Sequence, residues 1–265
     1  MRRVLVLGGT AEGRRLAERL VAAGVPVVSS LAGRLRRPEL PPGEVRLGGF
    51  GGPEALGRWL RDERIGAVVD ATHPFAAQIT AHAVAAAEDA GVPLLVVRRP
   101  GWTASPGDVW VRRPTLAAAA EALDDLGERV LLTIGRQGLA AFAGRGEWFL
   151  VRVVEPPGAG VGGGETGRGP LPARCRVITA RGPFGVGDEE ALLREHAIDV
   201  VVTKDSGGDA TAAKLVAARR LGLPVVVVDR PPLPAGVTAV EDVEAAVTWA
   251  GARARRAQPD GTMGG

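Results

Sequence analysis

Short apolar runs alternate along the chain with longer segments in which apolar and charged residues recur at helical spacing. Many of the runs are continuously apolar, which is typical of parallel strands covered on both faces. They predict strands near 3–7, 25–29, 66–70, 93–97, 109–111, 129–134, 149–154, 176–179, 198–203, 224–228 and 237–239. The helical patterns lie at 12–23, 53–63, 75–90, 115–126, 137–143, 188–195, 208–221 and 241–250. This alternation predicts an α/β fold with parallel sheets.

An internal sequence repeat indicates that the chain has two similar halves. The stretches AGVPLLVVRRP (90–100) and LGLPVVVVDRP (221–231) align without gaps, and the same offset pairs Thr72 with Thr203. We therefore expect α/β halves at 1–127 and 128–251. The alternative is that strand–helix–strand units resemble one another without being repeats.

Two segments are predicted to lie outside the regular elements. The stretch PPGAGVGGGETGRGPLP (156–172) is rich in glycine and proline without periodicity, which indicates a surface loop or lid. From Ala252 onward the residues ARARRAQPDGTMGG predict a disordered tail over 252–265.

Composition narrows the class of protein. Charges are mixed in sign, net charge is +3, and no basic run with interleaved aromatics points to nucleic acid. Cys175 is the only cysteine, which excludes an intramolecular disulfide and suits a reducing cytoplasm. No stretch approaches the roughly 20 apolar residues that span a membrane, and the N-terminus lacks a signal-peptide pattern. We expect a cytoplasmic protein whose many arginines suit an acidic small molecule.

A nucleotide-binding pattern opens the chain, in RRVLVLGGTAEGRRLAERL. Gly8 and Gly13 have the spacing of the outer glycines in G-x-G-x-x-G, and Thr10 replaces the middle one. Gly8 and Gly9 allow a sharp turn close to a pyrophosphate, the helix start favours an anion, and the Thr10 hydroxyl can donate to phosphate. We count Glu12 of this turn among the cofactor-binding candidates. A plain strand-to-helix turn is the alternative.

The second predicted strand favours NADPH over NADH. At its end an NAD-type site carries Asp or Glu for the ribose hydroxyls, but here Ser29 and Ser30 stand there, followed by Arg34. Hydroxyl groups and a guanidinium suit the 2′-phosphate of NADPH. The neighbouring Arg36 and Arg37 are equally able to supply that charge, and a solvated arginine is the alternative.

The second half opens with a comparable corner, ERVLLTIGRQGLAAF. Its strand leads into Thr133, Gly135 and Gln137 before a short helical pattern. These residues form a second candidate anion-binding corner, or a structural turn.

Together these segments resemble the precorrin-6A reductases and cobalt-precorrin-6A reductases of cobalamin biosynthesis. The resemblance covers about 1–250 and rests on VLVLGGTAEGRRLA, SLAGR, DATHPFA, LLTIGRQ, TKDSGG and KLVAARRLGLPVVVVDRP in that order. It implies two Rossmann-like domains with parallel sheets, and NADPH and a corrinoid precursor in the cleft between them. It also implies reduction of one macrocyclic C=C bond by hydride plus proton. As a separate hypothesis, we count hand-over of the product to neighbouring pathway enzymes among the candidate interactions.

The strand-end corners THPF and TKDSGG supply the remaining candidates. His73, Lys204, Asp205 and bulk water are candidate proton donors. His73 and Lys204, with Ser206 and Gly207, are also candidates for binding the carboxylates of the substrate. For His73 we favour binding over an acid role, because it precedes a proline and its repeat partner is a lysine.

Two further residues in these corners, Thr72 and Asp70, have more modest interpretations. Thr72 is a cofactor-binding candidate, and Asp70 is expected to cap the following helix rather than to orient His73. For Asp205 and Ser206 a helix cap is the alternative to ligand contact.

Other functions fit less well. Short-chain reductases need a tyrosine, and the chain has none. A non-enzymatic NAD(P)-binding regulatory module remains the alternative. We expect no metal site, because His82 and His196 have no partners at ligand spacing.

Overall fold

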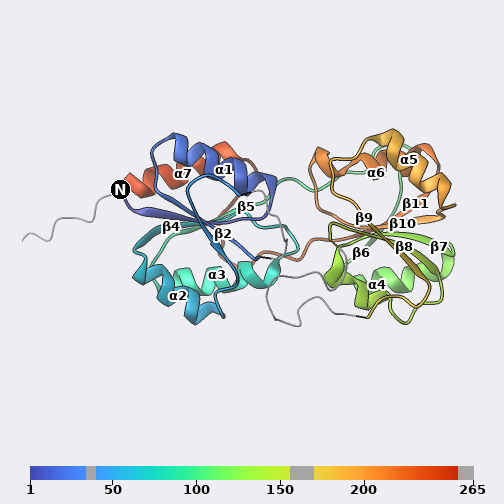
Figure 1. Cartoon of the computed structure of the whole chain (residues 1–265), viewed down its shortest axis with the longest axis horizontal. Helices are drawn as coiled ribbons and strands as arrows, with labels where there is room; N and C mark the ends of the chain where they lie inside the picture. Colours follow the sequence, from blue (N-terminus) through green and yellow to red (C-terminus); the bar gives the residue numbers. More distant parts are fainter. Residues whose placement is uncertain (34–39, 156–169, 256–265) are drawn as a thin grey trace, which may run out of the picture. The chain divides into compact units, whose positions relative to one another are not determined.

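The computed structural model describes residues 1–33, 40–155 and 170–255, which form two parallel six-stranded sheets flanked by helices (Figure 1). The first sheet has the order β12-β5-β4-β1-β2-β3 and the second β6-β11-β10-β7-β8-β9. The predicted α/β class with parallel sheets is confirmed. Arg34 and its neighbours 36 and 37, most of the predicted loop 156–172, and the tail beyond 255 lie outside the described residues.

Unit 1 is built on the first sheet. Its strands are β1 (Arg3–Leu7), β2 (Val27–Leu31), β3 (Glu44–Leu47), β4 (Ile65–Asp70), β5 (Leu94–Val97) and β12 (Ala239–Val240). Helices α1 (Ala11–Ala22) and α7 (Val243–Arg255) cover one face, and α2 (Pro53–Asp62) and α3 (Ala77–Asp89) cover the other. An apolar core fills the space on each side of the sheet, because alternate strand residues point to opposite faces.

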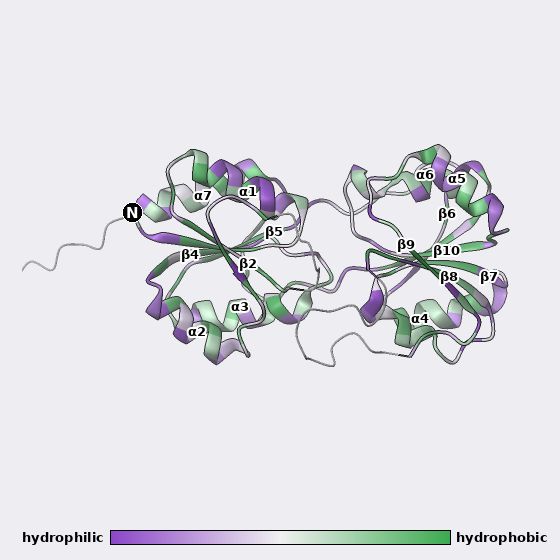
Figure 2. Cartoon of the chain, viewed as in Figure 1, coloured by the Kyte–Doolittle hydropathy of each residue, from purple (hydrophilic) through white to green (hydrophobic). Residues whose placement is uncertain are grey.

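Unit 2 repeats this plan on the second sheet. Its strands are β6 (Val109–Arg113), β7 (Arg129–Thr133), β8 (Trp148–Val153), β9 (Cys175–Thr179), β10 (Val200–Lys204) and β11 (Pro224–Val228). Helices α5 (Val186–Glu195) and α6 (Ala213–Arg220) cover one face, while α4 (Leu116–Glu121) lies on the other (Figure 1). The described part of unit 2 also contains three short 3₁₀ helices: η1 (Ala122–Asp125), η2 (Arg136–Phe142) and η3 (Asp209–Thr211). The strands are mostly hydrophobic, and hydrophilic residues gather on the helices (Figure 2).

The chain does not divide at 127/128 as we expected, because one strand from each expected half belongs to the sheet of the other half. Unit 1 comprises residues 1–99 and the chain from Pro232 onward, and unit 2 comprises residues 100–231. Strand β6 pairs with β11, and β12 pairs with β5. The alternation of strands and helices reveals that a strand exists, whereas long-range pairing decides which sheet it joins. The expected cleft concerns the relative placement of the units and stays a prediction.

Some elements differ from the sequence expectation. Strand β3 was not predicted, because as the edge of its sheet it is half exposed and lacks a continuous apolar run. The helix expected at 137–143 is the 3₁₀ helix η2, and that expected at 208–221 is divided into η3 and α6. Helix α7 continues to Arg255, so the segment 252–255 is helical rather than part of a disordered tail. No helix in the described part of the chain is long and apolar enough to cross a membrane.

Candidate functional site

The turn between β1 and α1 has the form that the glycine spacing predicted. Gly9 adopts φ +108°, and a Cβ added there would meet nothing within 4 Å. Gly13 is tightly packed, because its Cβ would come within 3.1 Å of the Gly8 Cα and 3.5 Å of the Ala71 Cβ. The first turn of a helix leaves backbone N–H groups without intrahelical partners, and the dipole adds partial positive charge. Open space at Gly9 before a 12-residue helix fits a phosphate group.

Thr10 has a different role from the one we expected. Its hydroxyl donates to the Ala71 carbonyl at 2.6 Å and accepts from the Gly13 N–H at 3.0 Å, as the N-cap of α1. A hydroxyl has a single proton, so this one is committed to Ala71 rather than to a phosphate. Thr10 therefore caps the helix and ties its start to the end of β4.

Glu12, in the first turn of α1, is held by an arginine that the sequence reasoning missed. Nη1 of Arg99 donates to Oε2 of Glu12 at 2.7 Å, and both side chains are largely buried. The signal was present in the repeat, where Arg99 aligns with Arg230 immediately before a proline.

At the end of β2, both candidate serines are buried. Ser29 is 1 % exposed and Ser30 6 % exposed, and the Gly8 N–H donates to the Ser30 carbonyl at 3.0 Å. Ser30 thus supports the glycine turn through its backbone.

An arginine that the sequence did not suggest lies beside Ser30. Arg46 is the register partner of Ser30 on β3. Its guanidinium donates to the carbonyls of Gly48 and Gly49 at 2.7 and 2.8 Å and lies over the Phe50 ring. Burial lowers the pKa of Arg46. The region of Arg34 is outside the described residues, and Arg46 is a cation that the structure places beside Ser30.

Asp70 organises the corner between β4 and α3. Its Oδ1 accepts from the backbone N–H and the hydroxyl of Thr72 at 2.9 and 2.7 Å, and its Oδ2 accepts from the Thr80 hydroxyl at 2.6 Å. The N-cap position of α3 is Ala76, so the expected cap role of Asp70 is wrong. The buried carboxylate instead joins the turn to the body of α3 through Thr80. It also occupies the hydroxyl of Thr72, a cofactor-binding candidate.

His73 lies half-buried in this corner. Its Nδ1 accepts from the Phe75 N–H at 3.2 Å. An accepting Nδ1 carries no proton, so the proton of the neutral ring is on Nε2. A cavity of about 10 Å³, roughly the space of one water molecule, adjoins the corner and is lined in part by His73, Thr72 and Arg98.

The second predicted corner keeps its turn but not its helix. Gly135 adopts φ +75° ahead of the 3₁₀ helix η2, and Gln137 is exposed. The Thr133 hydroxyl donates to the Val202 carbonyl at 3.2 Å. Because the helix is 3₁₀, the aligned dipole that we expected to attract an anion is weaker.

Unit 2 presents Lys204 at the carboxyl end of β10, followed by Asp205, Ser206 and Gly207. In parallel α/β sheets, ligands bind at this edge. Neither Asp205 nor Ser206 caps a helix, since the N-caps of η3 and α6 are Gly208 and Ala212. The alternative in which these residues act as caps is wrong.

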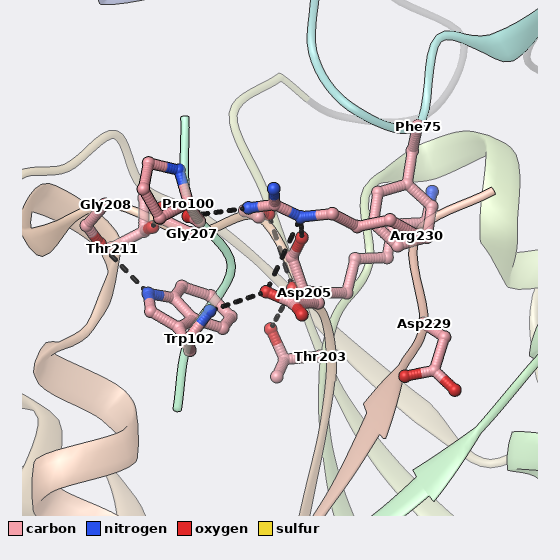
Figure 3. Close-up of polar contacts among 12 residues, drawn as sticks. Phe75, Pro100, Trp102, Thr203, Asp205, Gly207, Gly208, Thr211, Asp229 and Arg230 are labelled. Carbon is pink, nitrogen blue, oxygen red and sulfur yellow. Dashed lines mark hydrogen bonds and ion pairs between the residues drawn. The ribbon is translucent and has the colours of Figure 1, made fainter. Parts of the chain in front are cut away.

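Asp205 is the centre of a buried network (Figure 3). It is 4 % exposed, and its carboxylate accepts from the Trp102 N–H at 3.0 Å and from Nη2 of Arg112 at 2.8 Å. Nε of Arg230 donates to the Asp205 carbonyl at 2.7 Å and lies 3.7 Å from Oδ1. Burial alone would lower the pKa of Arg112, but its hydrogen bonds to Asp205 and Asp229 raise the pKa overall. The Asp205 carboxylate is therefore already engaged by donors from within unit 2.

Gly207 lets this loop approach its neighbours closely. It adopts φ +66°, and a Cβ there would collide with the Pro100 carbonyl and the Arg230 guanidinium. The Trp102 indole N–H donates to the Gly208 carbonyl at 3.0 Å (Figure 3). The loop therefore requires glycine at 207 for steric reasons.

Lys214, which the sequence did not single out, is buried beneath the same loop. It is 6 % exposed, its Nζ donates to the Thr211 carbonyl at 2.5 Å, and it lies 4.8 Å from the centre of a Trp102 ring. Arg152 and Glu189 form a buried bidentate pair with distances of 3.0 and 2.9 Å. Burial lowers the pKa of Lys214 to about 7; the charge of Arg152 adds to this effect, and that of Glu189 opposes it.

No group of three or more potential metal ligands occurs among residues 1–33, 40–155 and 170–255. His196, one of the histidines that lack partners at ligand spacing, is the C-cap of α5.

Comparison with known proteins gives consistent matches. The family model described as precorrin-6x reductase CbiJ/CobK matches residues 3–251. A precorrin-6A reductase from Rhodococcus erythropolis is 52 % identical over 258 residues, covering 97 % of this chain and 100 % of that protein. A precorrin-6A reductase from Mycobacterium tuberculosis is 52 % identical over 249 residues, covering 94 % and 97 %. The solved structure of a CobK precorrin-6A reductase matches with a TM-score of 0.85 at 44 % identity, over 96 % of this chain and 97 % of that one.

Proposed function

The chain belongs to the precorrin-6x reductase family CbiJ/CobK, and from this premise we propose that it uses NADPH to reduce precorrin-6A in cobalamin biosynthesis. The reaction saturates one C=C bond of the macrocycle, so the protein is an oxidoreductase acting on CH–CH groups. The observation that carries the proposal is the family match over residues 3–251, joined to the glycine turn at the start of α1.

We assign the phosphates of NADPH to the turn between β1 and α1. The open space at Gly9 and the N–H groups of the first turn of α1 support this assignment. When bound, the cofactor supplies a hydride. Ser30 and Arg34 stay our candidates for the adenosine end, and Thr72, Thr133, Gly135 and Gln137 stay candidates for other parts of the cofactor.

The substrate is a ring with several carboxylate arms, so its site needs cations and hydrogen-bond donors. In the loop after β10, Lys204 offers an ammonium, and Ser206 and Gly207 offer a hydroxyl and backbone groups. The imidazole of His73, whose Nδ1 accepts from the Phe75 N–H, is a further candidate. We propose that these groups bind carboxylates of the corrinoid.

The proton that completes the reduction has four candidate sources, and the contacts in the two corners rank them. The network around Asp205 argues against its carboxylate, which accepts hydrogen bonds from Arg112 and Trp102. The Phe75 bond to Nδ1 argues against a cationic His73. Of the two remaining candidates, Lys204 and bulk water, we favour Lys204, because an ammonium carries a proton that solvent can restore.

NADPH oxidation followed by absorbance, with precorrin-6A present, tests the function. We expect turnover with NADPH and much less with NADH, and parallel assays with the cobalt-bearing ring show which form is the substrate. Tight NADPH binding without turnover of either ring would favour a regulatory module instead. We place the enzyme in the cytoplasm, which suits its free Cys175, and hand-over of product to the next pathway enzyme stays a prediction.

A further inference from the structure

The chain passes between its two units twice, and each passage follows an arginine. The first lies between Arg99 and Pro100, and the second lies just after Arg230–Pro231, because the units comprise residues 1–99 with the chain from Pro232, and residues 100–231. The two dipeptides occupy equivalent positions, after β5 and after β11. Because the positions are equivalent, the two arginines are candidates for the same structural role.

In unit 1, Arg99 reaches back to the start of α1. Its Nη1 donates to the Glu12 carboxylate at 2.7 Å, and the side chains are 17 % and 27 % exposed. Glu12 lies two residues after the N-cap Thr10, in the turn whose N–H groups we assign to phosphate. The contact therefore fixes the nucleotide turn relative to the point where the chain leaves the unit.

In unit 2, Arg230 reaches back to the loop after β10. Its Nε donates to the Asp205 carbonyl at 2.7 Å, and its Nη2 donates to the Pro100 carbonyl at 3.0 Å (Figure 3). Asp205 is directly beside Lys204 and Ser206, the candidate carboxylate-binding residues. The same loop also holds the chain where it enters the unit, through the bond from the Trp102 N–H to Asp205.

We propose that Arg99 and Arg230 are positioning residues, each of which anchors a ligand loop of its own unit to a point where the chain passes to the other unit. Arg99 acts through Glu12 on the cofactor turn, and Arg230 acts through Asp205 on the corrinoid loop. This inference rests on the proposed function. It predicts that the two contacts affect different ligands although the arginines are equivalent in sequence.

The test compares the KM for each ligand in purified full-length variants. Arg99→Gln and Glu12→Gln should each raise the KM for NADPH roughly tenfold, equal to about 1.4 kcal/mol of binding, and leave the KM for precorrin-6A near the wild-type value. Arg230→Gln should do the reverse. So should Asp205→Asn, which removes the carboxylate charge 3.7 Å from Nε of Arg230 but keeps the hydrogen bond to the Asp205 backbone carbonyl. Arg61→Gln and Arg220→Gln, which break the exposed pairs with Asp89 and Glu190, serve as matched controls and should change neither KM.

The use of both partners of each pair separates positioning from simple electrostatics. Both ligands are anionic, so if charge alone mattered, removing an arginine would raise KM and removing a carboxylate would lower it. Positioning requires both changes in a pair to raise the same KM. It also requires the Arg99/Glu12 double variant to add little to the single ones, because these two side chains bond directly to each other. Opposite signs, or equal changes in both KM values, would overturn the proposal.

A purely structural role would lower the melting temperature without a selective change in KM, and that result would also count against the proposal. If Arg230→Gln does not fold, Arg230→Lys retains the charge and is expected to show the same selectivity in weaker form. If the wild-type enzyme does not turn over precorrin-6A, that result contradicts the proposed function but does not by itself contradict the anchoring role of Arg99. Calorimetry with NADPH then still tests the first anchor, because Arg99→Gln should raise Kd and Arg230→Gln should not.

Discussion

The backbone N–H of Phe75 donates to Nδ1 of His73, at an N···N distance of 3.2 Å. The bond holds the ring of the only histidine in the strand-end corner as the Nε2–H form. An occupied Nδ1 favours a binding role for His73 over that of an acid.

Replacement of His73 tests this role. We expect His73→Ala to raise the KM for precorrin-6A roughly tenfold, about 1.4 kcal/mol, with kcat nearly unchanged. His73→Asn can still accept from the Phe75 N–H, as asparagine does in turns, so it controls for loss of the turn and should raise KM as well. Steady-state kinetics decide between the roles, because an acid would lower kcat and kcat/KM equally.

Gly9 and Gly24 form a matched pair for the nucleotide turn. Both have positive φ, +108° and +74°, and a Cβ added to either meets nothing within 4 Å. We expect Gly9→Ala and Gly24→Ala each to cost about 1 kcal/mol of folding free energy, from backbone strain. Only Gly9→Ala should raise the KM for NADPH, because its methyl group enters the space assigned to a phosphate. An unchanged KM in Gly9→Ala would contradict that assignment.

Alanine substitutions at Gly207 and Gly222 distinguish the cost of a steric collision from the cost of backbone strain. Their φ values are +66° and +67°, but a Cβ at Gly207 collides with the Pro100 carbonyl, whereas one at Gly222 has open space. We expect Gly222→Ala to cost about 1 kcal/mol from strain and Gly207→Ala about 3 kcal/mol, because the loop must also shift. Urea unfolding of both variants measures the difference, and equal losses would show that the loop moves aside freely.

Lys214 predicts a pH dependence of stability. Its pKa in the folded protein is about 7, against an ordinary value of 10.5, because burial disfavours the ammonium. Between these values the unfolded chain binds a proton that the folded protein has released, so stability rises with pH. Between about pH 7 and about pH 9, the titration of Lys214 should raise the free energy of unfolding by roughly 2 kcal/mol.

The variant Lys214→Met lacks this titration. Its free energy of unfolding should therefore rise less than that of wild type over the same interval, by roughly 2 kcal/mol. Urea unfolding at several pH values gives both curves. Parallel curves would mean that Lys214 keeps its proton in the folded state.

Much of the protein follows from local sequence. Uninterrupted runs such as Val4–Leu7 can only be buried on both faces, and the spacing of Gly8 and Gly13 requires a close turn before a helix, so the α/β class and the start of α1 were predictable. The motifs that run in a fixed order over most of the chain also indicate the family, because their residues and spacing are properties of the sequence itself.

Tertiary structure decided the rest, because it depends on partners far away along the chain. The exchange of β6 and β12 between the sheets depends on pairing with β11 and β5, which local periodicity does not encode. Thr10 became a helix cap because Ala71 lies beside it. Asp205 changed from a candidate acid to a structural centre because Arg112 and Trp102, about a hundred residues earlier, donate to it. The sequence determines which chemical group each side chain carries. Which hydrogen-bond partner that group meets is determined only by the tertiary structure.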